Sequence, residues 1–132
     1  MTRTITFRGD YDWGAQPGGY SNRPYSEVEV IGPKGSISAF CIVDSGADYM
    51  QLPTEFLEQI GIDVPDDTTT VLDASLCNVV FEVFYNVEVV IEGKKTILDK
   101  VLSNPGVPPL LGRTAFLQVL DVGFDDDGWL HK

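Results

Sequence analysis

An aspartate that directly follows an apolar strand is the most informative feature of the sequence. The apolar run 39–43 ends on Asp44, Ser45 and Gly46. A carboxylate after a buried strand is costly unless it is hydrogen-bonded or lies in a solvated cleft. The glycine permits a sharp turn and a close approach by other groups. The pattern therefore indicates a carboxylate at the floor of a site, able to exchange a proton, with an ordinary turn as the alternative.

A second motif lies near the end of the chain, ahead of a short predicted helix and a final hairpin. It reads Pro109-Leu110-Leu111-Gly112-Arg113. Between the two motifs the sequence runs as a strand, a polar interruption and another strand, which is where a mobile hairpin would lie. The presence of both motifs favours a site over a simple turn.

Together these motifs resemble those of the retroviral-type, or retropepsin-like, aspartic proteases. That family carries Asp-Thr/Ser-Gly-Ala after an apolar strand and a hydrophobic-hydrophobic-Gly-Arg motif before its C-terminal helix. The resemblance extends from Ser26 to Phe124, whereas the segment 1–25, a predicted strand and a long loop, has no assigned role. The resemblance implies an all-β, single-domain acid-protease barrel over residues 1–132, with one or two short helices. It also implies an aspartic endopeptidase that uses no cofactor.

The resemblance assigns roles to the residues of both motifs. Asp44 would be the catalytic aspartate, and Ser45 would hold two active-site motifs together by hydrogen bonds across a dimer. Gly46 would offer its carbonyl to the substrate backbone. Active-site support and substrate binding would involve Ser45, Gly46, Ala47, Asp48 and Arg113.

An ion pair between Asp48 and Arg113 is implied by the same resemblance. Asp48 stands where the viral enzymes keep an acidic residue that touches substrate backbone and pairs with the arginine of the Gly-Arg motif. Such a pair would support the loop, to an extent that depends on its burial. Because most charged side chains are exposed, two separately solvated charges are the alternative.

The sequence contains a single Asp-Ser-Gly motif. Aspartic proteases need two carboxylates that share a proton, one acting as base toward water and the other as acid toward the scissile peptide. A single motif therefore predicts a homodimer with one Asp44 from each chain on the two-fold axis. The predicted reaction is attack of water on a peptide bond of a peptide or protein substrate, without a metal or a covalent intermediate.

The segment Thr70–Asn78 corresponds to the flap that covers substrate in this family. The family's flap is rich in glycine, but this segment contains none, and Asn78 is its residue best suited to a positive φ. This departure keeps two other hypotheses open: a catalytically weak or inactive binding or dimerisation module, and an acidic scaffold whose Asp44 motif is only a turn. The candidates for the flap and the subsite walls are Val71, Leu72, Leu76, Cys77 and Val107.

The elements that must position these residues read mostly as short strands. Alternating polar and apolar residues, bounded by Gly, Pro, Asn and Asp, are the signal. Proline at its start, an acidic first turn and a terminal glycine mark the first helix. Strands are predicted at 4–7, 26–30, 36–43, 69–72, 79–91, 96–98, 121–124 and 129–131, and helices at 53–61 and 112–117.

Composition restricts the partners. With 20 acidic residues against 9 Lys and Arg, the net charge is −11, which argues against nucleic acid or an anionic membrane. No apolar run reaches the length of a membrane helix, and the N-terminus does not resemble a signal peptide, so a cytoplasmic location is expected. Cys41, Cys77 and His131 are too few for a Cys/His zinc site, and we expect His131 to be exposed.

Overall fold

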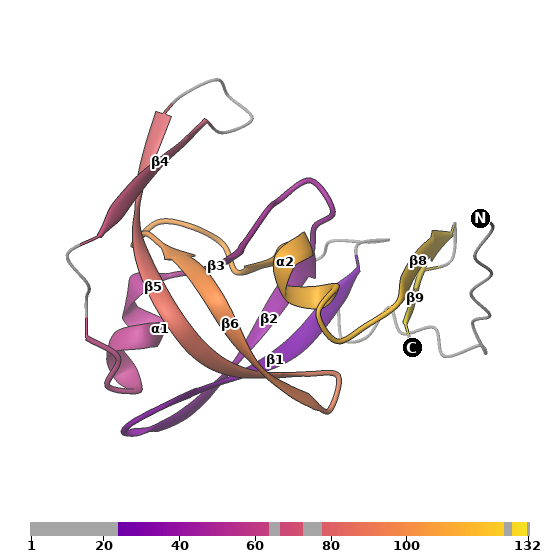
Figure 1. Cartoon of the computed structure of the whole chain (residues 1–132), viewed down its shortest axis with the longest axis horizontal. Coiled ribbons are helices and arrows are strands. Elements are labelled where there is room, and N and C mark those ends of the chain that lie inside the picture. Colours follow the sequence, from indigo (N-terminus) through magenta and orange to yellow (C-terminus); the bar gives the residue numbers. More distant parts are fainter. Residues whose placement is uncertain (1–23, 64–66, 73–77, 126–127, 132) are drawn as a thin grey trace.

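The computed structural model describes residues 24–63, 67–72, 78–125 and 128–131 of the chain (Figure 1). The strand predicted at 4–7 and the loop after it lie outside these residues, as do the flap candidates Leu76 and Cys77. The described part is mostly β-structure with two short helices, which agrees with the predicted class.

The strands are β1 (Tyr25–Gly32), β2 (Gly35–Val43), β3 (Met50–Leu52), β4 (Thr68–Leu72), β5 (Asn78–Ile91), β6 (Lys94–Ser103), β7 (Leu110–Leu111), β8 (Val122–Asp125) and β9 (Gly128–His131), and the helices are α1 (Thr54–Gln59) and α2 (Arg113–Phe116). Every strand and helix predicted after residue 24 is confirmed. The sequence did not reveal β3 and β7, which are too short to show alternation, and β6 is longer than predicted. None of the described helices is long and apolar enough to cross a bilayer.

Seven strands form one sheet in the order β1-β2-β7-β3-β6-β5-β4, and a pairing of β1 with β5 closes six of them into a ring that leaves β4 outside. The predicted β1–β2 hairpin is present, with Gly32 opposite Gly35 at its turn. Two contacts are parallel, β2 with β7 and β3 with β6. Parallel pairs need long connections, and these two bring segments that are distant in sequence into one region.

The main core is built from the buried faces of the ring strands and from both helices. In β1, Val28 and Val30 are buried while Glu29 between them is exposed, as expected for a strand with one face in the core. Alternate residues of β2 are buried in the same way and end on Val43, the residue before Asp44. A buried valine such as Val43 stabilises the fold by about 1.5–3 kcal/mol, so the end of β2 that precedes Asp44 is anchored in the core.

Strand β5 is long and curved and contributes to two separate apolar clusters (Figure 1). Its second half lies in the ring and faces the main core, whereas its first half extends beyond the ring with β4. There Phe81 and Val83 form a second cluster with Leu102 of β6. Asn86, at φ 56°, lies between the two halves, a conformation that Asn tolerates better than most residues.

Strands β8 and β9 form a two-stranded sheet of their own, next to the start of β1 in Figure 1. Phe124 on β8 is 51% exposed. His131 on β9, which we expected to be exposed, is largely covered, and its Nε2 lies 3.7 Å from a carboxylate oxygen of Glu92. The carboxylate of Glu92 also accepts a 2.7 Å hydrogen bond from the Ser26 hydroxyl. The C-terminal hairpin is thereby joined to the turn between β5 and β6.

Candidate active site

Strand β7 lies between β2 and β3 and so brings the two sequence motifs together. It runs parallel to β2, with Val43 opposite Leu111, and antiparallel to β3, with Gln51 opposite Leu110. The backbone N–H of Asp44 donates a 3.0 Å hydrogen bond to the Leu111 carbonyl. The aspartate therefore leaves β2 with its backbone fixed on the residue that precedes the Gly-Arg motif.

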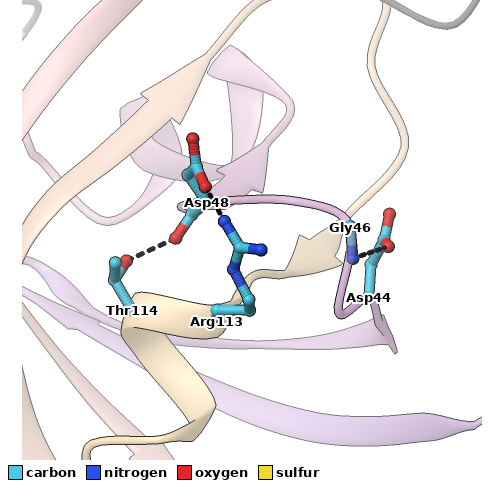
Figure 2. Close-up of polar contacts among 5 residues, drawn as sticks. All are labelled: Asp44, Gly46, Asp48, Arg113 and Thr114. Carbon is cyan, nitrogen blue, oxygen red and sulfur yellow. Dashed lines mark hydrogen bonds and ion pairs between the residues drawn. The ribbon is translucent and has the colours of Figure 1, made fainter.

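The segment after β2 turns sharply at Asp44 (Figure 2). The carboxylate Oδ1 of Asp44 accepts a 2.8 Å hydrogen bond from the Gly46 N–H, and the Asp44 carbonyl accepts one of 3.3 Å from Ala47. The Asp44 side chain is only partly buried, and Ser45 and Gly46 are exposed. Asp44 thus forms the turn of the second alternative while it stays partly exposed. The first alternative, a carboxylate that exchanges a proton at the floor of a site, stays a prediction.

Gly112 is required because two backbone segments cross there. A Cβ atom at this position would lie 2.4 Å from the Tyr49 carbonyl oxygen and 2.7 Å from its nitrogen. The φ of Gly112 is −81°, which any residue adopts, so the requirement is for space and not for an unusual dihedral angle. This contact sets the spacing between the Asp44 loop (residues 44–49) and the start of α2.

The ion pair predicted between Asp48 and Arg113 is present (Figure 2). An Nη2 of Arg113 donates to Oδ1 of Asp48, and the two side chains are 50% and 66% exposed respectively. Pairs this exposed contribute little to stability. The pair therefore fixes the orientation of two side chains at the surface rather than anchoring the core.

The first backbone groups of α2 hold the Asp44 loop more firmly than the ion pair does. The N–H of Arg113 donates to the Ala47 carbonyl at 2.9 Å, and the N–H of Thr114 donates to the Asp48 carbonyl at 3.0 Å. The Thr114 hydroxyl donates to the same Asp48 carbonyl at 2.6 Å. The first N–H groups of a helix have no partner within the helix, and here the loop supplies their acceptors. Thr114 was missed because nothing in its local sequence marks it.

The roles implied for Ser45 and Gly46 need a second chain or a substrate, and they stay predictions. Ala47 takes part through its carbonyl, which faces α2. Among the described residues, no group of three His, Cys, Asp or Glu side chains is placed to hold a metal ion.

The candidate flap is the hairpin of β4 and β5. Val71 pairs with Val79 and Leu72 with Asn78, and Val71 is 37% exposed. We expected Asn78 to suit a positive φ at the flap tip, and this expectation is wrong. Asn78 is not among the described residues with positive φ, and it continues the β-ladder with Leu72. Val107, on the loop between β6 and β7, packs with Val79 against the second apolar cluster. The structure therefore brings one predicted subsite residue against the base of the hairpin.

A hollow of about 380 Å³ adjoins the same cluster. Tyr49, Val83 and Leu102 belong to both, which makes the hollow a polar continuation of the apolar cluster. In the hollow a hydrogen bond to the Asp67 carboxylate raises the pKa of Tyr85. Its remaining lining residues are Asp67, Thr68, Thr69, Tyr85 and Lys100.

The Lys100 ammonium lies 5.7 Å from the centre of the Tyr49 ring, at the side of this hollow. That distance is within the range of a cation–π attraction. Tyr49 directly follows Asp48, so the hollow begins where the Asp44 loop ends. Comparisons of the chain with protein-family models and with curated proteins found no match.

Proposed function

We propose that this chain is one half of a homodimeric, retropepsin-like aspartic endopeptidase with Asp44 as its catalytic residue. One observation carries the proposal: the Asp44 loop is held by backbone hydrogen bonds to Leu111 and to the start of α2. The two motifs that resemble the family's are thus in direct contact, and Asp44 itself is only partly buried. The closed ring of strands and the two short helices also support the retropepsin-like barrel.

The proposed chemistry needs two Asp44 carboxylates that share one proton. Two carboxylates in hydrogen-bonding distance cannot both ionise easily, so one stays protonated while the other is charged. The charged one takes a proton from water as the water oxygen attacks the peptide carbonyl carbon, and the protonated one gives its proton to the carbonyl oxygen. Collapse of the resulting diol transfers a proton to the amide nitrogen, and the C–N bond breaks.

The β8–β9 sheet supports the dimer. A two-stranded sheet needs packing against other elements for stability. Val122 packs against the main core and His131 lies beside Glu92, but Phe124 is 51% exposed. A partner chain that packs on β8 and β9 would bury this surface. The dimer would carry twice the charge of −11, so apolar contact must offset the repulsion between the two chains.

The proposed substrate is an extended peptide with apolar side chains. Among the strands that the structure describes, β4 ends the order of the seven-stranded sheet, and its outer edge is the one proposed for strand addition. Val71 lies on this hairpin and Val107 packs against the apolar cluster at its side, and both are candidate subsite walls. Leu72, Leu76 and Cys77 remain proposed members of the same group.

The test compares Asp44→Asn with Asp99→Asn, a matched loss of one carboxylate on an exposed part of β6. Cleavage of a peptide library is followed by mass spectrometry at acidic to neutral pH, with and without a statine-type inhibitor. We expect the wild type and Asp99→Asn to cleave, the inhibitor to block both, and Asp44→Asn to lose roughly 10²–10⁴-fold in kcat/KM. Equal activity of the wild type and Asp44→Asn would overturn the proposal.

A second candidate function is a binding or dimerisation module with the same architecture and poor turnover. The absence of glycine from Thr70–Asn78 favours it, because closure over a substrate needs a flexible tip. Calorimetry with the statine-type peptide separates the two candidates. Binding without any cleavage by the wild type identifies the module, and binding with cleavage identifies the enzyme.

A further inference from the structure

We propose that Asn104 is a positioning residue that fixes the β4–β5 hairpin relative to the Asp44 loop. Asn104 directly follows β6 and begins the loop that carries Val107. The side chain of Asn104 makes two hydrogen bonds, one within this loop and one to the hairpin. The inference rests on the proposed function only where it concerns substrate.

The first bond orders the loop itself. The Asn104 Oδ1 accepts a 3.1 Å hydrogen bond from the Gly106 N–H, and the Asn104 backbone carbonyl accepts one of 3.4 Å from Val107. A side-chain oxygen that bonds the backbone two residues on is an Asx turn, in which asparagine replaces part of the backbone's own hydrogen bonding. Asn104 therefore determines where Val107 lies.

The second bond reaches the hairpin. The Asn104 Nδ2 donates a 3.0 Å hydrogen bond to the carbonyl of Val80 on β5. The Val83 N–H donates to the Asp67 carbonyl, on the β4 side of β5. Backbone groups alternate sides along a strand, so the Val80 carbonyl points to the β6 side.

On that side the β6 ladder, as far as the described residues show, does not reach Val80. The last pair between β5 and β6 joins Glu82 to Ser103, and β6 ends there. The Asn104 amide takes the place that a further residue of β6 would occupy in the ladder. The side chain thus extends the attachment of the hairpin beyond the end of the strand.

Apolar packing also joins the loop after β6 to the β4–β5 hairpin. Val79 of the hairpin and Val107 of the loop both pack against the cluster of Phe81, Val83 and Leu102. In Figure 1 the orange loop leaves β6 beside β5, below the β4–β5 hairpin. A polar bond and an apolar cluster therefore join the loop and the hairpin into one unit.

The far end of the loop is attached to the strands that flank the Asp44 loop. The Gln51 Nε2 on β3 donates to the Pro108 carbonyl at 3.1 Å, and the Ile42 N–H on β2 donates to the Pro109 carbonyl at 3.2 Å. A continuous set of contacts therefore runs from Val80 through Asn104 to the residues on both sides of Asp44. The position of the hairpin relative to the Asp44 loop is therefore expected to depend on this loop.

The experiment uses the full chain and separates the two bonds. Asn104→Asp keeps the oxygen that accepts from Gly106 but replaces the amide donor by a second oxygen, which repels the Val80 carbonyl. Asn104→Ala removes both bonds. Asn86→Asp is the matched control, because it makes the same chemical change at an exposed position on β5 outside the hairpin.

Hydrogen–deuterium exchange measures the attachment directly. Loss of one hydrogen bond predicts exchange about fivefold faster or more across β4 and residues 78–84 in Asn104→Asp and Asn104→Ala. Exchange in β1 and β2, and throughout Asn86→Asp, should match the wild type. Unchanged exchange in the hairpin, or an equal increase throughout the chain, overturns the proposal.

A second readout addresses substrate. We expect both Asn104 variants to raise KM, or the Kd of the statine-type peptide, several-fold more than they lower kcat, since the chemistry at Asp44 is untouched. An unchanged KM and Kd overturn the positioning role. A protein that neither cleaves nor binds any peptide contradicts the proposed function, and the exchange result then decides the role of Asn104 by itself.

Discussion

A Cβ atom on Gly112 would lie 2.4 Å from the carbonyl oxygen of Tyr49. No side chain fits between these two backbone segments, one of which follows Asp48 while the other precedes Arg113. Contact between backbone atoms, and not between side chains, therefore sets the distance between the two motifs.

Gly112→Ala should therefore be strongly destabilising. Backbone atoms cannot move aside as a flexible side chain can, so we expect a loss of about 3 kcal/mol in the free energy of unfolding. Gly106→Ala is the control, because a Cβ there meets only Asn104 Oδ1 at 3.9 Å. Urea denaturation measures both, and equal stabilities of the two variants would contradict the prediction.

The Asp48–Arg113 pair should contribute little to stability. Both side chains are at least half exposed, so we expect a coupling energy of about 0.2–1 kcal/mol from a double-mutant cycle of Asp48→Ala and Arg113→Ala. High salt should reduce this coupling. Breaking a buried ion pair costs about 3 kcal/mol or more. A coupling of that size would contradict the prediction that this pair is exposed and weak.

Cys41 should make the fold sensitive to alkali. Burial raises the pKa of its thiol from 9.0 to about 12. Between these two values the unfolded chain loses the proton and the folded chain keeps it, so the stability from this group is complete below pH 9 and falls as the pH rises toward 12. Urea denaturation as a function of pH should show a smaller alkaline loss in Cys41→Ala than in the wild type. Parallel pH curves for the two proteins would rule out this origin.

Assembly should strengthen as the acidic charge is reduced. Each chain carries a net charge of −11, and repulsion between two such chains falls when carboxylates are protonated or screened. We expect the dimer dissociation constant from analytical ultracentrifugation to decrease from about pH 7 to pH 5, and to decrease with added salt at neutral pH. A dimer that weakens under either change, or a strict monomer at every concentration, is the opposite outcome.

Much of the fold can be predicted from local pattern. The alternation around Glu29 predicts β1, and the proline and glycine at the ends of 53–61 predict α1. These signals are reliable because an element that buries one face has apolar residues at the period of that element. Strands β3 and β7 leave no such trace, since two or three residues cannot show a period.

The candidate site is only partly predictable for the same reason. The Asp48–Arg113 pair was expected because both residues belong to motifs. Thr114 and Asn104 were not, because their partners, the carbonyls of Asp48 and Val80, lie far away in sequence. Contacts of a side chain with a distant backbone group depend on the tertiary fold, and no spacing rule reveals them.

The position of β7 between β2 and β3 determines when the Asp44 loop can assemble during synthesis of the chain. The strands that flank the Asp44 loop gain their shared neighbour only when residues 110 and 111 are present. Contacts between segments so far apart in sequence form slowly, since a long loop must close first. During translation we therefore expect the Asp44 loop to remain unassembled until residues 110–114 have left the ribosome. A nascent chain carries its aspartate long before it carries the strand and helix that hold it in place.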